Sequence, residues 1–168
     1  MIATIVEIAR LQFRNVSFYT IHIEGMPLPE YADFVARMSK KCPNQLGELL
    51  HFIDEIGQRR YGIEGRYFRH ERNAHALPPS YMHLTNDDSE ANSEFGLRLY
   101  CCRFTSGIVV LYNGDLKTTR RPDDCPNVSG HFDFALRATE SIDQAIKDGY
   151  IKLLDTEIEI EEDFILEI

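Results

Sequence analysis

The sequence predicts an α+β fold in which helices cover one side of a mainly antiparallel β-sheet. Two strand-like runs open the chain, two amphipathic helical patterns follow, and a strand hairpin and a third helix come after them. Strands and helices that segregate along a chain in this way are typical of α+β domains. We expect a single domain at residues 1–154, with its core at about 18–147, and an acidic C-terminal tail at 155–168.

The first strands are predicted from their aromatic and β-branched residues. Phe18–Ile23 is rich in both types and ends at Glu24-Gly25. Ile2–Ile8 is the expected companion strand.

Two helices are predicted next, after Pro27 and Pro29. Apolar residues recur at the spacing i, i+3, i+4 and i+7, which places them on one face of an α-helix. They are Tyr31, Phe34, Val35 and Met38. Pro43-Asn44 interrupts this pattern, with Asn44 as the expected N-cap of the second helix. The stripe of that helix is Leu46, Leu49, Leu50, Ile53 and Ile56, so we expect a helical hairpin.

The stretch between the second helix and the next strands is less regular. Tyr67-Phe68-Arg69 predicts a short strand, and Leu77-Pro78-Pro79 must be extended or turning. Residues 86–93 predict a polar loop.

The clearest local signal is a β-hairpin. Leu97–Phe104 and Ile108–Tyr112 are strand-like runs joined by Thr105-Ser106-Gly107, with glycine in the turn. Asn113-Gly114-Asp115 is expected to end the second strand.

The C-terminal part predicts a helix and then an acidic tail. The helix spans about His131–Asp148, with Gly149 as its C-cap. The tail, residues 155–168, holds seven acidic groups and no basic one. Its segment Ile158–Glu161 alternates with period two, which favours an acidic strand. The alternative is a segment docked on a basic face, where it would mimic nucleic-acid charge and inhibit.

Composition limits the classes of protein. Apolar residues make up 43% of the 168 residues, which is enough for a packed core. No run approaches the length of a membrane helix, and the N-terminus lacks the pattern of a signal peptide, so we expect a cytoplasmic protein without membrane association. The cysteines, Cys42, Cys101, Cys102 and Cys125, form no CxxC pair, so neither a zinc knuckle nor a disulfide framework is indicated.

Charge is distributed unevenly. The net charge is −9, but the chain without the acidic tail carries only −2. Arginines crowd residues 59–72, and Lys117, Arg120 and Arg121 form a second basic group. Such local clusters can contact phosphates even in an acidic protein. The segment His70–His75 is superficially like a zinc-protease HExxH motif, but its second histidine falls one residue too late for a shared helical face.

The hairpin and the basic turn carry a family resemblance. Phe95–Tyr100, Ile108–Leu111 and the turn Lys117–Arg121 are similar to the strands and basic turn of the RelE/ParE/HigB-like toxin superfamily. Tyr67-Phe68-Arg69 resembles that family's strand ending in an arginine, and the resemblance covers about residues 18–147. It implies a helical hairpin packed beside a twisted antiparallel sheet. The first strands, the 86–94 loop and the acidic tail have no counterpart in its smallest members.

The resemblance also implies site residues. Arg98 matches the strand arginine that contacts phosphate, and Lys117 and Arg120 match the basic turn. His131 falls near the family's tyrosine or histidine general acid. The further RNA-binding residues are Arg69, Arg72 and Arg121. Strand parity puts Arg98 and Tyr100 on the face opposite Leu97 and Leu99.

The function implied is that of a toxin of a bacterial toxin–antitoxin pair, an endoribonuclease that cleaves messenger RNA on the ribosome or free. Fixed cations would stabilise the charge that develops on the scissile phosphate, with neither metal nor cofactor. A helix-turn-helix antitoxin, messenger RNA or the ribosome, and a second copy of the chain are the expected partners. The alternatives are a non-catalytic toxin-fold protein that binds a protein target, as ParE-like members do, and an accessory protein.

Simpler interpretations of the same residues stay open. Arg98, Lys117, Arg120 and Arg121 would also fit a solvated strand edge and turn. Arg69 and Arg72 would also fit structural ion pairs with Glu64 or Glu71, and His131 a surface position at the start of a helix.

Overall fold

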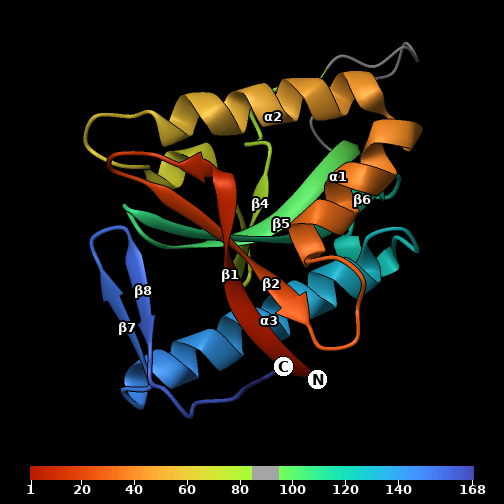
Figure 1. Cartoon of the computed structure of the whole chain (residues 1–168). Coiled ribbons are helices and arrows are strands. Elements are labelled where there is room, and N and C mark those ends of the chain that lie inside the picture. The colour runs from red at the N-terminus through yellow and green to blue at the C-terminus, as the bar shows by residue number, and fades with distance from the viewer. Residues whose placement is uncertain (85–94) are drawn as a thin grey trace.

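The computed structural model describes residues 1–84 and 95–168 of the chain (Figure 1). The predicted polar loop at 86–93 therefore lies outside the described residues. The α-helices are α1 (Glu30–Lys41), α2 (Pro43–Gly57) and α3 (Ser129–Lys147). The strands are β1 (Ile2–Gln12), β2 (Ser17–Ile23), β3 (Arg69–Glu71), β4 (Ala74–Leu77), β5 (Gly96–Thr105), β6 (Ile108–Lys117), β7 (Ile151–Leu154), β8 (Glu157–Ile160) and β9 (Leu166–Glu167). Short 3₁₀ turns lie at Gly65–Tyr67 and Pro122–Asp124.

The predicted α+β class and the mainly antiparallel sheet are confirmed. A seven-stranded sheet has the order β3-β4-β5-β6-β2-β1-β9, and β7 and β8 form a separate hairpin. Strand β2 runs parallel to β6, with Tyr19 opposite Val110. The other neighbouring strands of the described sheet are antiparallel.

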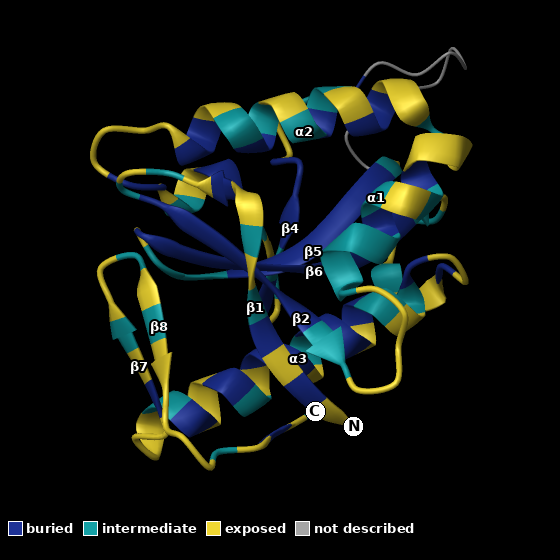
Figure 2. Cartoon of the chain, viewed as in Figure 1, coloured by how far each residue is buried: buried dark blue, intermediate teal, exposed yellow. Residues whose placement is uncertain are grey.

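The prediction that helices cover one side of the sheet is wrong. Helices α1 and α2 lie over one face and α3 over the other, so the sheet is the middle layer of three (Figure 1). Leu99 and Leu111 pack in the core beneath α1 and α2, whereas Tyr100 and Tyr112 pack beneath α3. Figure 2 shows the central strands buried along most of their length. Periodicity identifies a helix but does not say which face of the sheet it covers.

The helical hairpin forms as its apolar stripes predict. Phe34 and Met38 of α1 and Leu49 and Ile53 of α2 are fully buried against the sheet. Burying each such side chain stabilises the fold by about 2 kcal/mol. The second helix begins two residues earlier than expected, because Pro43 fits its first position and Cys42, not Asn44, is the N-cap.

Several predicted boundaries differ from the observed ones. Strand β6 does not end at Tyr112 but continues through Asn113-Gly114 to Lys117. The Asn113 side chain faces α1, and its oxygen accepts hydrogen bonds from both Arg37 and the Gly114 amide. The strand expected at Tyr67-Phe68-Arg69 begins only at Arg69, after a 3₁₀ turn. Helix α3 begins at Ser129 and ends at Lys147, followed by Gly149 with a φ of 84°.

The acidic tail contains ordered strands. Glu157–Ile160 pairs with β7, and Leu166–Glu167 adds to the edge of the main sheet beside β1. Leu166 is buried in the core beneath α3, and the Ile168 carbonyl accepts a hydrogen bond from the Met1 amino group at 2.9 Å. The tail thus pairs with the start of the β1 edge, at Ile2 and Ala3, and protects that part from pairing with another chain. No helix in the described ranges has the length and apolarity needed to span a bilayer.

A buried histidine makes the fold sensitive to acid. The His75 ring on β4 accepts a hydrogen bond from the Arg103 backbone N–H at 2.9 Å. Burial, then the charges of His70 and Arg103, lower the pKa of His75 to about 4. Between these two pKa values, His75 is neutral in the folded state, whereas the unfolded chain binds a proton at this residue. Stability should fall as pH drops through the window from about 6.5 to about 4.

We expect His75→Asn, which keeps an acceptor but does not titrate, to reduce that fall. The free energy of unfolding from urea titrations at several pH values in this window measures it. The exposed His51→Asn is the matched control and should follow the wild type. A pH dependence unchanged in His75→Asn would contradict the assignment.

Candidate functional site

Two arginines predicted to contact RNA approach each other on the face of the sheet that carries α3. Arg69 of β3 pairs with Ala76 of β4, which pairs with Tyr100 of β5, and Arg98 lies two residues before Tyr100. Arg98 is only 2% exposed, and burial followed by the positive charge of Arg69 lowers its pKa to about 10.

Both guanidinium groups have backbone contacts that orient them. Arg98 Nη1 donates to the Leu97 carbonyl at 3.0 Å, and Arg69 Nε donates to the Pro78 carbonyl at 2.8 Å. Burial also lowers the pKa of Arg69. Two cations held near one another in a poorly solvated place repel, and the Glu71 carboxylate offsets part of that repulsion at both arginines.

Tyr100 adds a buried donor to this pair. It is fully buried, and its ring packs on Phe132 of α3 with centroids 5.4 Å apart. Its hydroxyl has no hydrogen-bond partner among the residues that the structure describes. Burial and then the Glu71 carboxylate raise the pKa of Tyr100, so the hydroxyl stays protonated and able to donate.

The other predicted cations form a rim around this position. Arg72 lies 5.6 Å over the Phe132 ring, and its Nη2 pairs with Asp123 Oδ2 at 2.9 Å. Arg120 and Arg121 are exposed on the segment after β6, next to the 3₁₀ turn that holds Asp123. Lys117, the last residue of β6, is only 8% exposed. Arg72, Arg120 and Arg121 are thus the predicted site cations open to solvent.

His131 faces a different set of charges. It lies in the first turn of α3, and burial, then Arg37, lowers its pKa against the opposing effect of Asp115 and Asp33. The charges that act on Arg98 come from Arg69, Tyr100 and Glu71. The structure therefore brings Arg69 and Arg98 near each other, whereas His131 lies near Arg37, Asp115 and Asp33.

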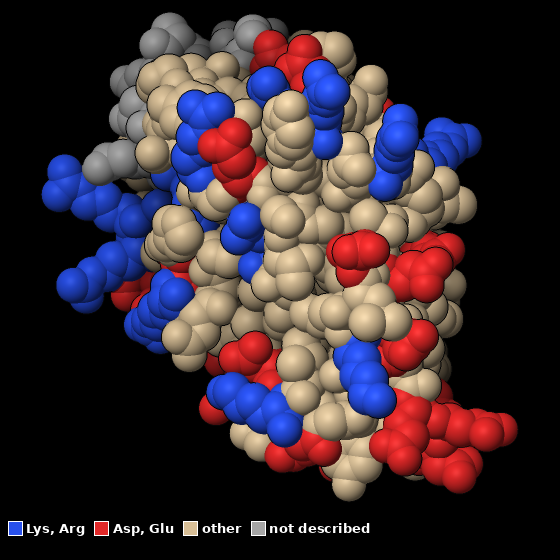
Figure 3. Space-filling model, turned by 90° about the vertical axis from the view of Figure 1, so that its left-hand side faces the viewer, with Lys and Arg blue, Asp and Glu red and all other residues tan. Residues whose placement is uncertain are grey.

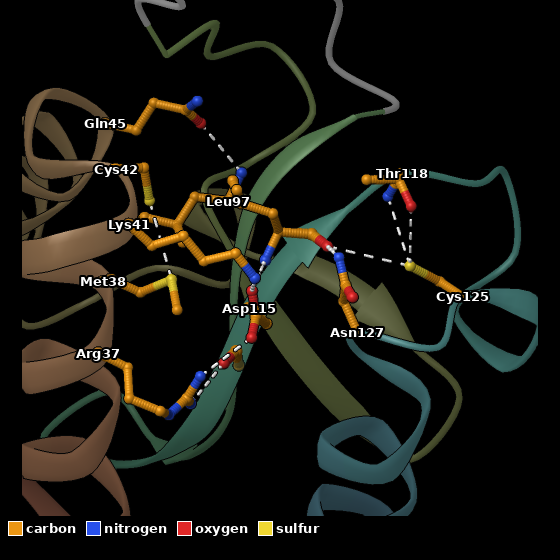
Figure 4. Close-up of polar contacts among 12 residues, drawn as sticks. Arg37, Met38, Lys41, Cys42, Gln45, Leu97, Asp115, Thr118, Cys125 and Asn127 are labelled. Atoms are coloured by element: carbon orange, nitrogen blue, oxygen red, sulfur yellow. Dashed lines mark hydrogen bonds and ion pairs between the residues drawn. The ribbon is translucent and has the colours of Figure 1, made fainter.

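Those neighbours form an ion-pair cluster that ties α1 to the end of β6 (Figure 4). The Asp115 carboxylate, 12% exposed, accepts from Arg37 Nη1 at 3.0 Å and Lys41 Nζ at 2.6 Å. Burial alone would raise the pKa of Asp115, but the bonds from Lys41 and the Leu116 amide and the charges of Lys41 and Arg37 lower it. Arg37 also donates to the Gly114 carbonyl at 2.8 Å. The cluster holds a helix on a strand, which is a structural role.

A thiol on the other side of the β6 end was not singled out from the sequence. Cys125 Sγ lies 3.4 Å from the Thr118 amide and 3.5 Å from its hydroxyl (Figure 4). Burial would raise the pKa of this thiol, but hydrogen bonds from Thr118 and from the backbone of Asn127 and Val128 lower it to about 7. The sequence feature that could have identified Cys125 is its position just before α3, because backbone amides at the start of a helix favour an anion.

The histidines of the HExxH-like segment lie on a β-hairpin. His70 on β3 pairs with His75 on β4, and their rings meet edge to face at 4.9 Å. Such a motif needs both histidines on one helix. Across residues 1–84 and 95–168, no group of three or more His, Cys, Asp or Glu side chains could hold a metal ion.

No family model matches this chain, and comparisons with curated proteins and with solved structures found no match.

The ion-pair cluster predicts a stability defect. Arg37→Ala leaves the Asp115 carboxylate buried with one cation fewer, and should lower the free energy of unfolding by about 2 kcal/mol in urea titrations. Arg137→Ala, whose pair with Asp133 is exposed, should cost less than about 0.5 kcal/mol. If Arg37→Ala and Asp115→Ala were simply additive in the double variant, the proposed coupling would be absent.

Cys125 predicts a titration near neutral pH. The ultraviolet absorbance of thiolate in the wild type, minus that of Cys125→Ser, should rise with a midpoint near the pKa of about 7. Thr118→Val removes the hydroxyl donor and should move the midpoint upward. A midpoint at or above the ordinary thiol value in the wild type would rule out the stabilised thiolate.

Proposed function

We propose that this chain acts on RNA as the toxin of a toxin–antitoxin pair. The observation that carries the proposal is the approach of Arg69 and Arg98 beside the buried hydroxyl of Tyr100. Two cations buried on one face would give that face a positive field toward a phosphate that approaches from the surface. The resemblance of the β5–β6 hairpin to RelE/ParE/HigB-like toxins supports the same choice.

The rim and the buried pair would have different roles. Arg72, Arg120 and Arg121 are exposed and would make the first contacts with RNA phosphates. Arg98 and Arg69 lie beneath, where low solvation strengthens their field on a nearby phosphate. In the endoribonuclease form of the proposal, the RNA 2′-hydroxyl attacks the adjacent phosphorus and these cations stabilise the extra negative charge. An antitoxin that covered the rim would silence the protein.

A second candidate is a toxin-fold protein that binds a protein target. The observation that favours it is the apolar surface of the C-terminal hairpin, where Tyr150, Leu154, Ile160 and Ile165 are exposed. Acidic residues accompany them, so the complementary partner would offer a basic, apolar segment.

Induced expression in bacteria tests the proposal. Wild type should arrest growth and produce cleaved transcripts, which are read by sequencing of RNA ends. The double variant Arg72→Ala/Arg121→Ala should weaken binding to single-stranded RNA about tenfold, because it removes two exposed phosphate contacts. Arg98→Gln should lose cleavage while circular dichroism shows a folded chain.

The matched control is Arg137→Ala, an exposed arginine on the outer surface of α3. It should bind RNA and arrest growth as the wild type does. Growth arrest without cleavage would favour the protein-target candidate. No arrest by the wild type would overturn the toxin proposal.

A further inference from the structure

A second basic site lies at the other end of β6. Strand β6 runs from Ile108 to Lys117, so the two ends of the strand are about 30 Å apart. At the Ile108 end, four segments distant in sequence surround a cleft of about 500 Å³, which is in the size range of small-ligand sites. The cleft of interest is lined by Arg14, Asn15, Arg60, Tyr61, Gly62, Ser106, Gly107, Asp155 and Thr156.

The loops around this cleft are fixed to one another by hydrogen bonds. Asn15 Nδ2 donates to the Arg60 carbonyl at 2.7 Å, and the Ile63 amide donates to the Ser106 carbonyl at 2.7 Å. The Tyr19 hydroxyl donates to the Thr156 carbonyl at 2.7 Å. The side chains that line the cleft are therefore presented from a preformed backbone, which reduces the entropy lost on binding.

Gly62 allows two of these segments to approach closely. Its φ of 88° is left-handed, and a Cβ there would lie 2.6 Å from the Ser106 carbonyl oxygen. Only glycine allows the chain to pass so close to the β5–β6 turn in this conformation. The turn sets the direction in which Arg60 and Tyr61 leave the backbone.

The cleft contains two arginines, Arg14 and Arg60, together with the single carboxylate of Asp155. Within the described residues, the guanidinium groups of Arg14 and Arg60 form no ion pair, whereas Arg66 pairs with Glu64 and Arg72 with Asp123. Asp155 is the one acidic residue of the lining. Figure 3 views this end of the molecule, with Lys and Arg over its upper and left parts and Asp and Glu concentrated at lower right.

Tyr61 adds an exposed aromatic surface. Tyr61 is 86% exposed. The Arg60 guanidinium lies 5.4 Å from its ring centroid. An arginine beside an open aromatic ring is the arrangement with which proteins hold single-stranded nucleic acid, because the ring stacks on a base while the cation meets a phosphate.

We propose that this cleft binds a nucleotide of single-stranded RNA, with Arg14 and Arg60 on phosphates and Tyr61 stacked on an unpaired base. The inference rests on the proposed function, because it identifies a second RNA contact for a chain that acts on RNA. Unpaired bases are required because a duplex buries the faces on which Tyr61 would stack.

Fluorescence anisotropy with a labelled uridine-rich 12-mer RNA tests the inference on the full chain. Arg14→Ala/Arg60→Ala should raise Kd about tenfold and reduce the slope of log Kd against log salt by about 1.4, since each phosphate contact on a single strand contributes about 0.7. Tyr61→Ala should raise Kd at least about fivefold, and Tyr61→Phe should restore binding. A hairpin RNA of the same length should bind more weakly than the 12-mer.

The controls are Arg137→Ala for charge and Tyr81→Ala, another exposed tyrosine, for aromatic surface. Both should bind as the wild type does. Unchanged Kd in the Arg14/Arg60 and Tyr61 variants, with binding lost in Arg72→Ala/Arg121→Ala, would overturn this inference and leave the proposed function standing. Weakened binding in the cleft variants of a chain that arrests no growth would support the cleft and overturn the toxin proposal. A wild type that binds neither RNA would overturn both.

Discussion

The burial of β6 on both faces is the constraint on which the rest of the structure depends. Val109 and Leu111 pack beneath α1 and α2, while Val110 and Tyr112 pack beneath α3. A strand covered on both sides must be apolar along its length, and its neighbours must bring two separate cores to it. Where the apolar run ends, the Asp115 carboxylate is paired with Arg37 and Lys41, so the strand can continue under α1 without an uncompensated charge.

This double burial decides which residues can meet a partner. Arg98, on the strand next to β6, is only 2% exposed and almost inaccessible. Its positive charge can still act over a short distance, but direct contacts belong to side chains at the ends of the strands. Arg121 follows the Lys117 end of β6, and Arg14, Arg60 and Tyr61 lie near the other end. The rigid middle layer thereby holds two groups of functional candidates at a fixed separation.

Sequence patterns predicted the elements whose signals are local. The stripe through Phe34 and Met38 and the hairpin around Gly107 were found because periodicity and turn chemistry act over a few residues. The short strand at Ala74–Leu77 was missed because prolines follow it, and Asn113-Gly114 was taken for a strand end although tertiary contacts with Arg37 keep it extended. Parity placed Arg98 on the face opposite Leu97 and Leu99, but its burial depends on tertiary packing, which no local pattern shows. The cleft at Arg14 and Arg60 unites residues distant in sequence, so only the fold could bring them together.

The central claim is that RNA meets this chain at the two ends of β6. Photochemical cross-linking of RNA containing 4-thiouridine, followed by mass spectrometry of the attached peptides, tests it most directly. The account predicts cross-links in the segment around Tyr61 and in the segment around Arg120 and Arg121. Cross-links confined to the acidic hairpin of β7 and β8, or none above the level of an unrelated acidic protein, would contradict it.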